Sequence, residues 1–248
     1  MTGIVYLVGA GPGAADLLTL RAARLLAEAD VVLHDALVSA DVLALAGKAK
    51  LYNVGKRAGR ASVDQRFICR LLARMGQRHK VVVRLKGGDP HLFARATEEI
   101  EACRAAGVPV VTVPGVSAGF AAASALGVSL TARGVSRSVT FVTPAKGRGE
   151  AENTHWAEAA AAAETAVIYM GAGEALRVSA ALIARGVPSQ RPVAVIESAS
   201  SPEQRVLRGV LADLPELAAQ IGVGPALMIV GEIAASARAA LDIAEAAA

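Results

Sequence analysis

The feature that most constrains the fold of this chain is a series of short, nearly uninterrupted apolar runs, each followed by a segment with helical spacing of apolar residues. In the first half these runs cover 4–8, 31–33, 51–54, 81–85 and 110–113. Strands that are apolar on both faces have to be covered by helices on both sides, and helical connections return the chain for a parallel strand. We therefore expect an α/β protein.

The pattern changes near residue 114, after which the units are fewer and longer. Strands are also predicted over 138–143, 166–170, 193–196 and 226–230, and helices over 16–27, 62–76, 94–106, 118–126 and 174–185. The helix near 62 is expected to open with a capping box, because Ser62 and Gln65 have the spacing of that motif. We predict two α/β domains, 1–114 and 115–248, with mixed, mostly parallel sheets flanked by helices.

The composition supports a folded enzyme-sized core and narrows the partners. Apolar residues make up 54% of the 248 residues and charged residues 19%, which is a globular balance. Aromatic residues make up only 3%, which argues against single-stranded nucleic acid, because such binding depends on stacking. Arginine greatly outnumbers lysine, which suits carboxylate or phosphate ligands. A high-GC genome would produce the same excess, so only particular arginines carry weight.

Further patterns bear on where the chain acts. The uncharged stretch 105–132 is broken by Gly and Pro, so we predict a strand, a turn and a helix rather than a membrane span. The first residues carry no basic segment and are expected to form a strand rather than a signal peptide. Cys69 and Cys103 form no CxxC pair and are predicted to be free thiols in the reducing cytoplasm. The four histidines lack metal-ligand spacing, so no metal is expected.

Two glycine-containing segments follow predicted strands. Segment 9–13 (Gly-Ala-Gly-Pro-Gly) lies between a strand and a helix, where a phosphate-binding loop would lie, but Ala14 and Pro12 depart from the dinucleotide motif. Segment 86–90 (Lys-Gly-Gly-Asp-Pro) is a turn sequence in which two glycines would let a ligand approach the backbone. A nicotinamide-dependent dehydrogenase therefore stays open as an alternative on the first segment alone.

Charged residues also follow the predicted strands. Asp35 comes after strand 31–33 and Lys56 after strand 51–54, at carboxyl ends where catalytic groups collect in α/β proteins. Arg95 and Glu98 are three residues apart and share one face of a predicted helix. Taken alone, these residues are better explained as ordinary loop charges and, for Arg95 and Glu98, as a weak surface ion pair.

Several segments together resemble the uroporphyrinogen-III C-methyltransferases, members of the tetrapyrrole methylase family. The resemblance runs in order from residue 3 to about 233, and segment 83–90 (VRLKGGDP) is its most specific part. The other segments are VYLVGAGPG (5–13), LLTLRA (17–22), DALV (35–38), VGKRAG (54–59), VPG (113–115), SVTFVT (138–143), VIYMG (167–171), EQRV (203–206) and GPAL (224–227).

This resemblance implies a cytoplasmic homodimer of two-domain α/β subunits, with S-adenosyl-L-methionine bound in the cleft between the domains. The implied reaction methylates uroporphyrinogen III at C2 and C7, giving precorrin-2 for sirohaem or cobalamin synthesis and S-adenosyl-L-homocysteine as by-product. The implied partner is a small tetrapyrrole, and neither nucleic acid nor a membrane is expected.

The resemblance also implies roles for individual positions. Asp35 and Lys56 match positions with acid and base roles, Arg95 and Glu98 match positions that act on the tetrapyrrole, and Arg133 matches a substrate-binding position. The positions that match the cofactor site are Pro12, Gly87, Gly88, Asp89, Leu92, Ser117, Ala118, Met170, Ala199 and Ala226.

The chain departs from the family around the expected tetrapyrrole side. Segment 93–99 reads Phe-Ala-Arg-Ala-Thr-Glu-Glu, where the family usually has Phe-Gly-Arg-Gly-Gly-Glu-Glu, and segment 131–133 reads Thr-Ala-Arg instead of Thr-His-Arg. These departures leave two further alternatives open, another corrin-pathway methyltransferase such as a precorrin-4 type, and a weakly active homologue that binds S-adenosylmethionine.

Overall fold

The structure is a computed structural model that describes residues 2–55, 64–146 and 153–235. The contacts between residues divide the chain into two units, Met1–Ala118 and Gly119–Ala248, and each is described by itself. Within the described ranges, no helix is long and apolar enough to cross a membrane. The uncharged stretch 105–132 forms a strand, a turn and a helix, as predicted.

The first unit contains a five-stranded sheet with the order β3-β2-β4-β1-β5, in which all four pairings are parallel. The strands are β1 (Ile4–Gly9), β2 (Val31–His34), β3 (Lys50–Asn53), β4 (Val81–Lys86) and β5 (Val110–Val113). The sequence places each of them correctly to within one residue at each end. Their carboxyl ends therefore meet at one edge of the sheet, which we call the carboxyl edge.

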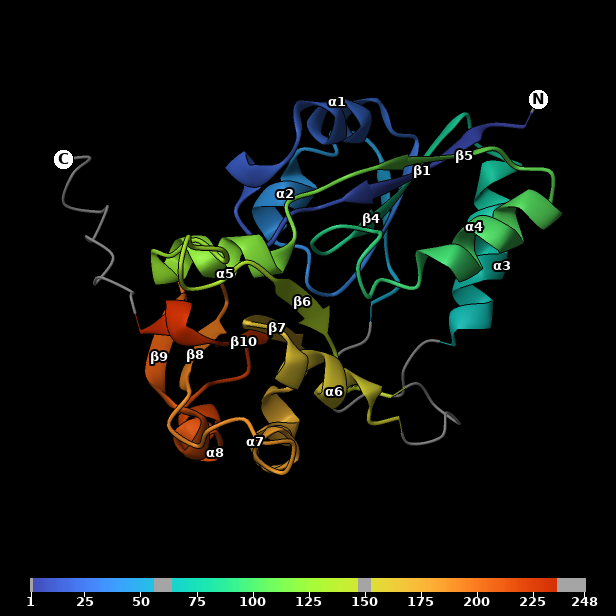
Figure 1. Cartoon of the computed structure of the whole chain (residues 1–248). Helices are drawn as coiled ribbons and strands as arrows, with labels where there is room; N and C mark the ends of the chain where they lie inside the picture. Colours follow the sequence, from blue (N-terminus) through green and yellow to red (C-terminus); the bar gives the residue numbers. More distant parts are fainter. Residues whose placement is uncertain (1, 56–63, 147–152, 236–248) are drawn as a thin grey trace, which may run out of the picture. The chain divides into compact units, whose positions relative to one another are not determined.

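Helices cover both faces of this sheet (Figure 1). One face packs against α1 (Leu20–Glu28) and α2 (Ala40–Ala44), in a core that includes Val8, Val32 and Leu85. The other face packs against α3 (Gln65–Gly76) and α4 (Ala96–Ala105), in a core that includes Leu7, Leu33 and Val82. Burial on both faces is the physical reason why the strands are nearly continuous apolar runs.

Three predicted helix starts are wrong, each because a capping or left-handed residue ends the preceding loop later. Thr19 is extended and accepts a hydrogen bond from the Ala22 N–H, so α1 begins at Leu20 and residues 15–17 form a separate 3-10 turn. Asp64 caps α3, which therefore begins at Gln65, and Ser62 of the predicted capping box lies outside the described residues. Arg95 has a φ of 56°, which delays α4 to Ala96.

The second unit contains a mixed sheet with the order β6-β7-β10-β8-β9. The strands are β6 (Val139–Val142), β7 (Thr165–Tyr169), β8 (Pro192–Glu197), β9 (Arg205–Val210) and β10 (Ala226–Val230). Only β6 and β7 pair in parallel, whereas the other three pairings are antiparallel. A short turn joins β8 to β9, which permits an antiparallel pair without a crossover helix. The α/β class with mixed sheets is confirmed, although this second sheet is mostly antiparallel.

One face of the second sheet is covered by α6 (His155–Ala162), α7 (Ala175–Ile183) and α8 (Leu214–Ala219) (Figure 1). On the other face, α5 (Ala118–Leu126) approaches closely at Gly119, whose N–H donates to the Tyr169 hydroxyl oxygen over 2.8 Å. A Cβ at Gly119 would lie 2.6 Å from that oxygen. Helices α2, α6 and α8 and strand β9 were not predicted from the sequence.

Three glycines bring the loops after β1, β4 and β5 into direct backbone contact at the carboxyl edge. A Cβ at Gly9 would lie 2.6 Å from the Gly115 Cα, and a Cβ at Gly115 would lie 2.5 Å from the Gly88 carbonyl oxygen. Gly11 and Gly88 also exchange two backbone hydrogen bonds, of 3.3 and 2.7 Å. No other residue type leaves room for this packing, because the nearest atoms are backbone atoms that cannot rotate away.

We predict that Gly115→Ala destabilises the protein by roughly 1–3 kcal/mol, because the added methyl group has to push apart backbone segments. Urea unfolding followed by circular dichroism measures the change. Gly173→Ala is the matched control, because no atom lies within 4 Å of a Cβ at that position. Equal stabilities of the two variants would contradict the packing argument.

Candidate functional site

Most of the predicted site residues of the first unit gather at the carboxyl edge. Pro12 follows β1, Asp35 follows β2, and segment 87–92 follows β4. Ser117 and Ala118 follow β5, and Lys56, predicted after β3, lies outside the described residues. Ligands of parallel α/β sheets bind at this edge, because the strand ends leave a crevice there.

The segment after β4 contains one glycine that its backbone conformation requires, Gly88, and one that it does not, Gly87. Gly88 has a φ of 69° and faces the start of α5, since a Cβ would lie 3.7 Å from the Ala118 nitrogen. Among the described residues, Gly87 has one neighbour within 4 Å of a Cβ built at its position, the Leu37 Cβ at 3.5 Å, which is an ordinary contact distance. The protein itself therefore does not require glycine at 87, and the space beside its backbone is available to a ligand.

Asp89 ties the β4 loop to the β5 loop. Its Oδ2 accepts a 2.9 Å hydrogen bond from the Gly115 N–H, and its Oδ1 accepts a 2.7 Å hydrogen bond from the His91 N–H. The His91 ring nitrogen Nδ1 also lies 2.9 Å from Oδ1. Burial acts to raise the pKa of this carboxyl group, but the hydrogen bonds from Gly115 and His91 outweigh it and lower the pKa.

The lowered pKa of Asp89 predicts an acid-dependent loss of stability. The stabilisation is present above about pH 4, the range of an unfolded aspartate, and is lost as the pH falls through the lower folded pKa. Asp89→Asn should therefore be destabilised relative to the wild type near neutral pH, by a difference that shrinks in acid. Urea unfolding at a series of pH values measures it.

The matched control for this experiment is Glu101→Gln, which removes an exposed carboxylate from α4 of the same unit. Its stability difference from the wild type should stay small throughout the pH series. A difference for Asp89→Asn that is the same at neutral and acid pH would contradict the role of the ionised carboxylate.

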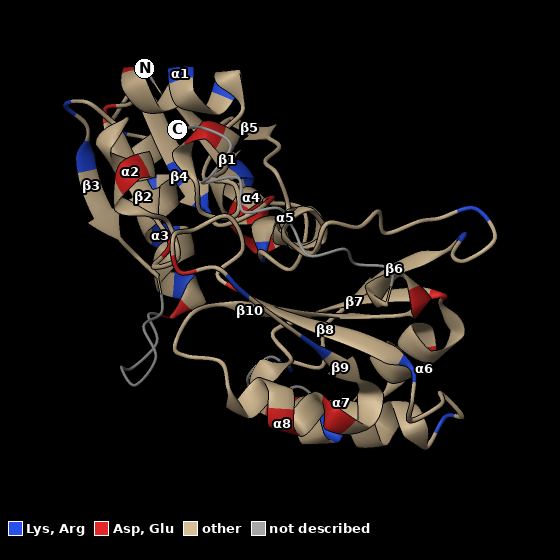
Figure 2. Cartoon of the chain, turned by 90° about the vertical axis from the view of Figure 1, so that its left-hand side faces the viewer, with Lys and Arg blue, Asp and Glu red and all other residues tan. Residues whose placement is uncertain are grey.

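Behind the carboxyl edge lies a cluster of buried charges formed by Arg84, Lys86 and Glu99. The exposed fractions of their side chains are 2%, 3% and 0%, respectively. Glu99 Oε1 is 3.2 Å from Arg84 Nε and 2.9 Å from Lys86 Nζ, and it also accepts a 3.1 Å hydrogen bond from the Gln65 amide. The charged residues of α1 and α2, whose places on these helices Figure 2 shows, are exposed in contrast.

Arg84 links this cluster to Asp35. Its Nη2 lies 2.5 Å from Asp35 Oδ1, and the Asp35 side chain is 30% exposed. Burial lowers the pKa of Lys86, as does the positive charge of Arg84, while the carboxylates of Glu99 and Asp35 act in the opposite direction. The predicted acid/base residue Asp35 is thus the solvent-exposed end of a buried ionic network.

The sequence analysis did not identify Arg84, Lys86, Glu99 or Gln65 as parts of the site. The available signal was the arginine inside the apolar run 81–85, because a charge buried in a parallel strand requires a buried partner. Alternation along β4 places Val82, Arg84 and Lys86 on one face, the face that α4 covers. Glu99 is on α4 and meets both cations there.

The predicted pair of Arg95 and Glu98 is formed. Two guanidinium nitrogens of Arg95 donate to the two carboxylate oxygens of Glu98, each over 2.8 Å, and both side chains are about half exposed. Phe93 and Arg95 have φ values of 53° and 56°, the left-handed region that favours glycine. Such backbone strain is concentrated at functional sites in proteins.

In the second unit, Met170, Ala199 and Ala226 lie at one edge of the sheet. Met170 follows β7 and Ala226 begins β10, in adjacent paired strands, and the Ser198 N–H donates to the Pro225 carbonyl over 2.8 Å, which brings Ala199 to the same edge. Met170 has a φ of 54° and is about half exposed. Arg133 is exposed in a loop of the same unit.

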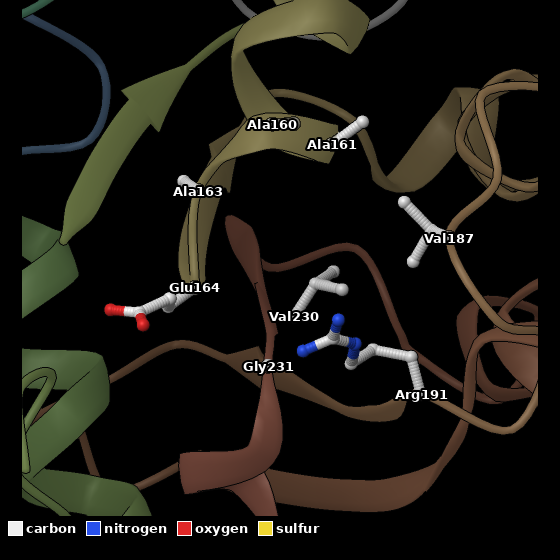
Figure 3. A pocket seen from close by; sticks show the side chains of 8 residues that line it. All are labelled: Ala160, Ala161, Ala163, Glu164, Val187, Arg191, Val230 and Gly231. Carbon is white, nitrogen blue, oxygen red and sulfur yellow. The ribbon is translucent and has the colours of Figure 1, made fainter. Parts of the chain in front are cut away.

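Two other features of the described residues lie apart from these groups. A pocket in the second unit contains none of the predicted site residues (Figure 3). Apart from Glu164 and Arg191, it is lined only by alanine, valine and glycine. In the part of the chain that the structure describes, no three His, Cys, Asp or Glu side chains are arranged to hold a metal ion.

A parallel sheet with glycine backbone at its carboxyl edge, and a charged network that reaches this edge, defines an α/β protein that binds a small molecule. Comparisons with known proteins specify the class. The Tetrapyrrole (Corrin/Porphyrin) Methylases match residues 4–215. The chain belongs to this family, which decides against the nicotinamide alternative.

Siroheme synthase from Tolumonas auensis is 45% identical over 236 residues, which cover 95% of this chain and 50% of that protein. The chain thus spans about half the length of the siroheme synthases it matches. A uroporphyrin-III C-methyl transferase from Thermus thermophilus, solved with S-adenyl homocysteine, is 39% identical with a TM-score of 0.82, covering 94% of this chain and all of that one. A cobalt precorrin-4 methyltransferase is 28% identical with a TM-score of 0.80, covering 93% and 95%.

Proposed function

We propose that the chain is an S-adenosylmethionine-dependent C-methyltransferase that converts uroporphyrinogen III to precorrin-2 by methylation at C2 and C7. The observation that carries this proposal is the likeness to the Thermus thermophilus uroporphyrin-III C-methyl transferase along the whole of that chain. The cobalt precorrin-4 methyltransferase has a similar fold but lower identity, so a precorrin-4 type of substrate is the second candidate.

The cofactor residues fit S-adenosylmethionine in their chemistry. Gly87 exposes its backbone at the carboxyl edge, where an adenosyl ligand can approach it closely, while the two hydrogen bonds between Gly88 and Gly11 hold the loop in place. Asp89 holds the Gly115 backbone in place, so its contribution to binding is to shape the edge. Bound S-adenosylmethionine supplies a methyl group on a positively charged sulfur, which is already electrophilic, so the protein mainly has to align it.

Asp35 supplies the charge that the tetrapyrrole reaction requires. Attack by a pyrrole carbon develops positive charge on the ring nitrogen, which a nearby carboxylate stabilises. Loss of a proton then completes each methylation and requires a base. The 30% exposure of the Asp35 side chain leaves it accessible from the carboxyl edge, while Arg84 contacts its buried side. Lys56, which lies outside the described residues, is proposed as a second acid/base group.

Arg95 and Arg133 are proposed to bind carboxylate groups of the tetrapyrrole. Uroporphyrinogen carries eight such groups, and guanidinium groups pair with them through two hydrogen bonds. In the structure Arg95 pairs with Glu98, so the substrate has to share or displace this contact. Glu98 therefore sets how strongly Arg95 binds the substrate.

Three expectations about the whole protein are also proposals: its compartment, its oligomeric state and its division into domains. Free cysteines are typical of a reducing compartment, and Cys69 and Cys103 are both free and buried, which supports action in the cytoplasm. The family resemblance supports a homodimer. We also propose that the two units correspond to two domains that join near residues 114–118.

The proposed function is tested by incubating the protein with S-adenosylmethionine and uroporphyrinogen III and following product mass and absorbance. We expect a gain of two methyl groups. Arg95→Ala should lose most turnover but keep its affinity for S-adenosylhomocysteine, because Arg95 is proposed to contact only the tetrapyrrole. Titration calorimetry measures that affinity.

Arg104→Ala is the matched control, because Arg104 is exposed in the last turn of the same helix. It should retain the wild-type rate. If the wild type binds S-adenosylhomocysteine but methylates only a precorrin-4 type of substrate, the second candidate is right; methylation of neither substrate contradicts both.

A further inference from the structure

We propose that Arg84 is a positioning residue, which is fixed by Glu99 and by backbone carbonyls and in turn holds the Asp35 carboxylate in its reactive orientation. The inference rests on the proposed function, because it assigns Arg84 to the step in which Asp35 takes part. It adds a residue to which the sequence alone assigned no role.

Every nitrogen of the Arg84 guanidinium group has a partner. Nε lies 3.2 Å from Glu99 Oε1, and Nη2 lies 2.5 Å from Asp35 Oδ1. Nη1 donates to the Leu85 carbonyl over 3.0 Å and to the Leu33 carbonyl over 3.4 Å. The guanidinium plane is rigid, so these contacts on three sides fix its orientation and therefore the position of the contact with Asp35.

The members of the ionic network differ in how deeply they are buried. Arg84 and Glu99 are fully buried, whereas the Asp35 side chain is 30% exposed. Among Arg84, Lys86, Glu99 and Asp35, Asp35 is thus the residue that can contact a ligand. The network therefore transmits an orientation from the interior of the unit to its carboxyl edge.

The stability of the fold does not by itself explain the buried arginine. Burying two cations and a carboxylate costs desolvation energy, and replacing such groups together by apolar residues is often neutral or stabilising. An aliphatic residue at 84 would suit the apolar run 81–85 equally well. Stability alone therefore gives no reason for an arginine at this position, whereas holding Asp35 does.

The test is a double-mutant cycle with Arg84→Met, Asp35→Ala and the variant that combines both. The rate constant kcat, the KM for uroporphyrinogen III and the Kd for S-adenosylhomocysteine are measured for each protein. Arg84→Met should lower kcat by roughly 10- to 100-fold, the usual effect of removing a group that orients a reactive one, with KM and Kd within about twofold. In the Asp35→Ala background, the same change should have no further effect.

Among the described residues, the Arg84→Met variant leaves Lys86 as the cation in contact with Glu99, and a folding defect would obscure the result. A second variant, Arg84→Met with Lys86→Met and Glu99→Met, removes all three buried charges together and is expected to fold. The melting temperature of this triple variant should be close to that of the wild type, and its kcat should remain as low as that of Arg84→Met. Arg191→Met is the matched control, because Arg191 pairs with Glu232 in the second unit. This variant should retain the wild-type rate.

A wild-type rate in the stable triple variant would overturn the proposal, as would an undiminished effect of Arg84→Met in the Asp35→Ala background. A crystal structure of Arg84→Met gives a readout besides activity, and Asp35 should leave its wild-type position in it. If the wild type methylates no tetrapyrrole, the proposed function fails. The positioning role is tested separately by the crystal structure, and it is refuted if Asp35 keeps its wild-type position in Arg84→Met.

Discussion

The contact among the backbones of Gly9, Gly88 and Gly115 is the constraint on which the rest of the site depends. It requires three parallel strands to end at one level and their loops to pack without side chains between them. Asp89 then reaches the Gly115 N–H, and Gly87 is left beside open space. Arg84 lies within β4 and Gly88 follows the end of that strand, so one segment of the chain supplies both the backbone of the proposed cofactor site and the charge that holds Asp35.

Much of the fold was predictable because its strongest signals are local. Strands β1, β2 and β4 are mostly apolar and mostly buried, and all five strands of the first sheet were located to within a residue. Strand β9 was missed because Arg205 and Arg208 interrupt it and it lies at an edge, where one side needs no partner. The helix starts depended on caps such as Thr19 and Asp64, whose role is decided by backbone angles rather than by composition.

The site was predictable to the extent that it depends on strand ends and on resemblance. Most of the residues assigned to the first unit gather at the carboxyl edge, and Lys56 lies outside the described residues. The buried network was not predicted, because Arg84 and Glu99 are 15 residues apart in sequence and only the packing of α4 on β4 brings them together. The structure also shows Asp89 bonded to Gly115 and His91, a role that its position in a turn sequence did not indicate.

The central claim is that the glycine backbone at the carboxyl edge forms the binding surface for S-adenosylmethionine. Gly87→Ala tests it most directly, because the nearest protein atom would lie 3.5 Å from the new Cβ and the fold should accept it. Titration calorimetry with S-adenosylhomocysteine should show at least about tenfold weaker binding, with an unchanged melting temperature, since an added methyl group would occupy the ligand's space. Binding as tight as that of the wild type would contradict the claim.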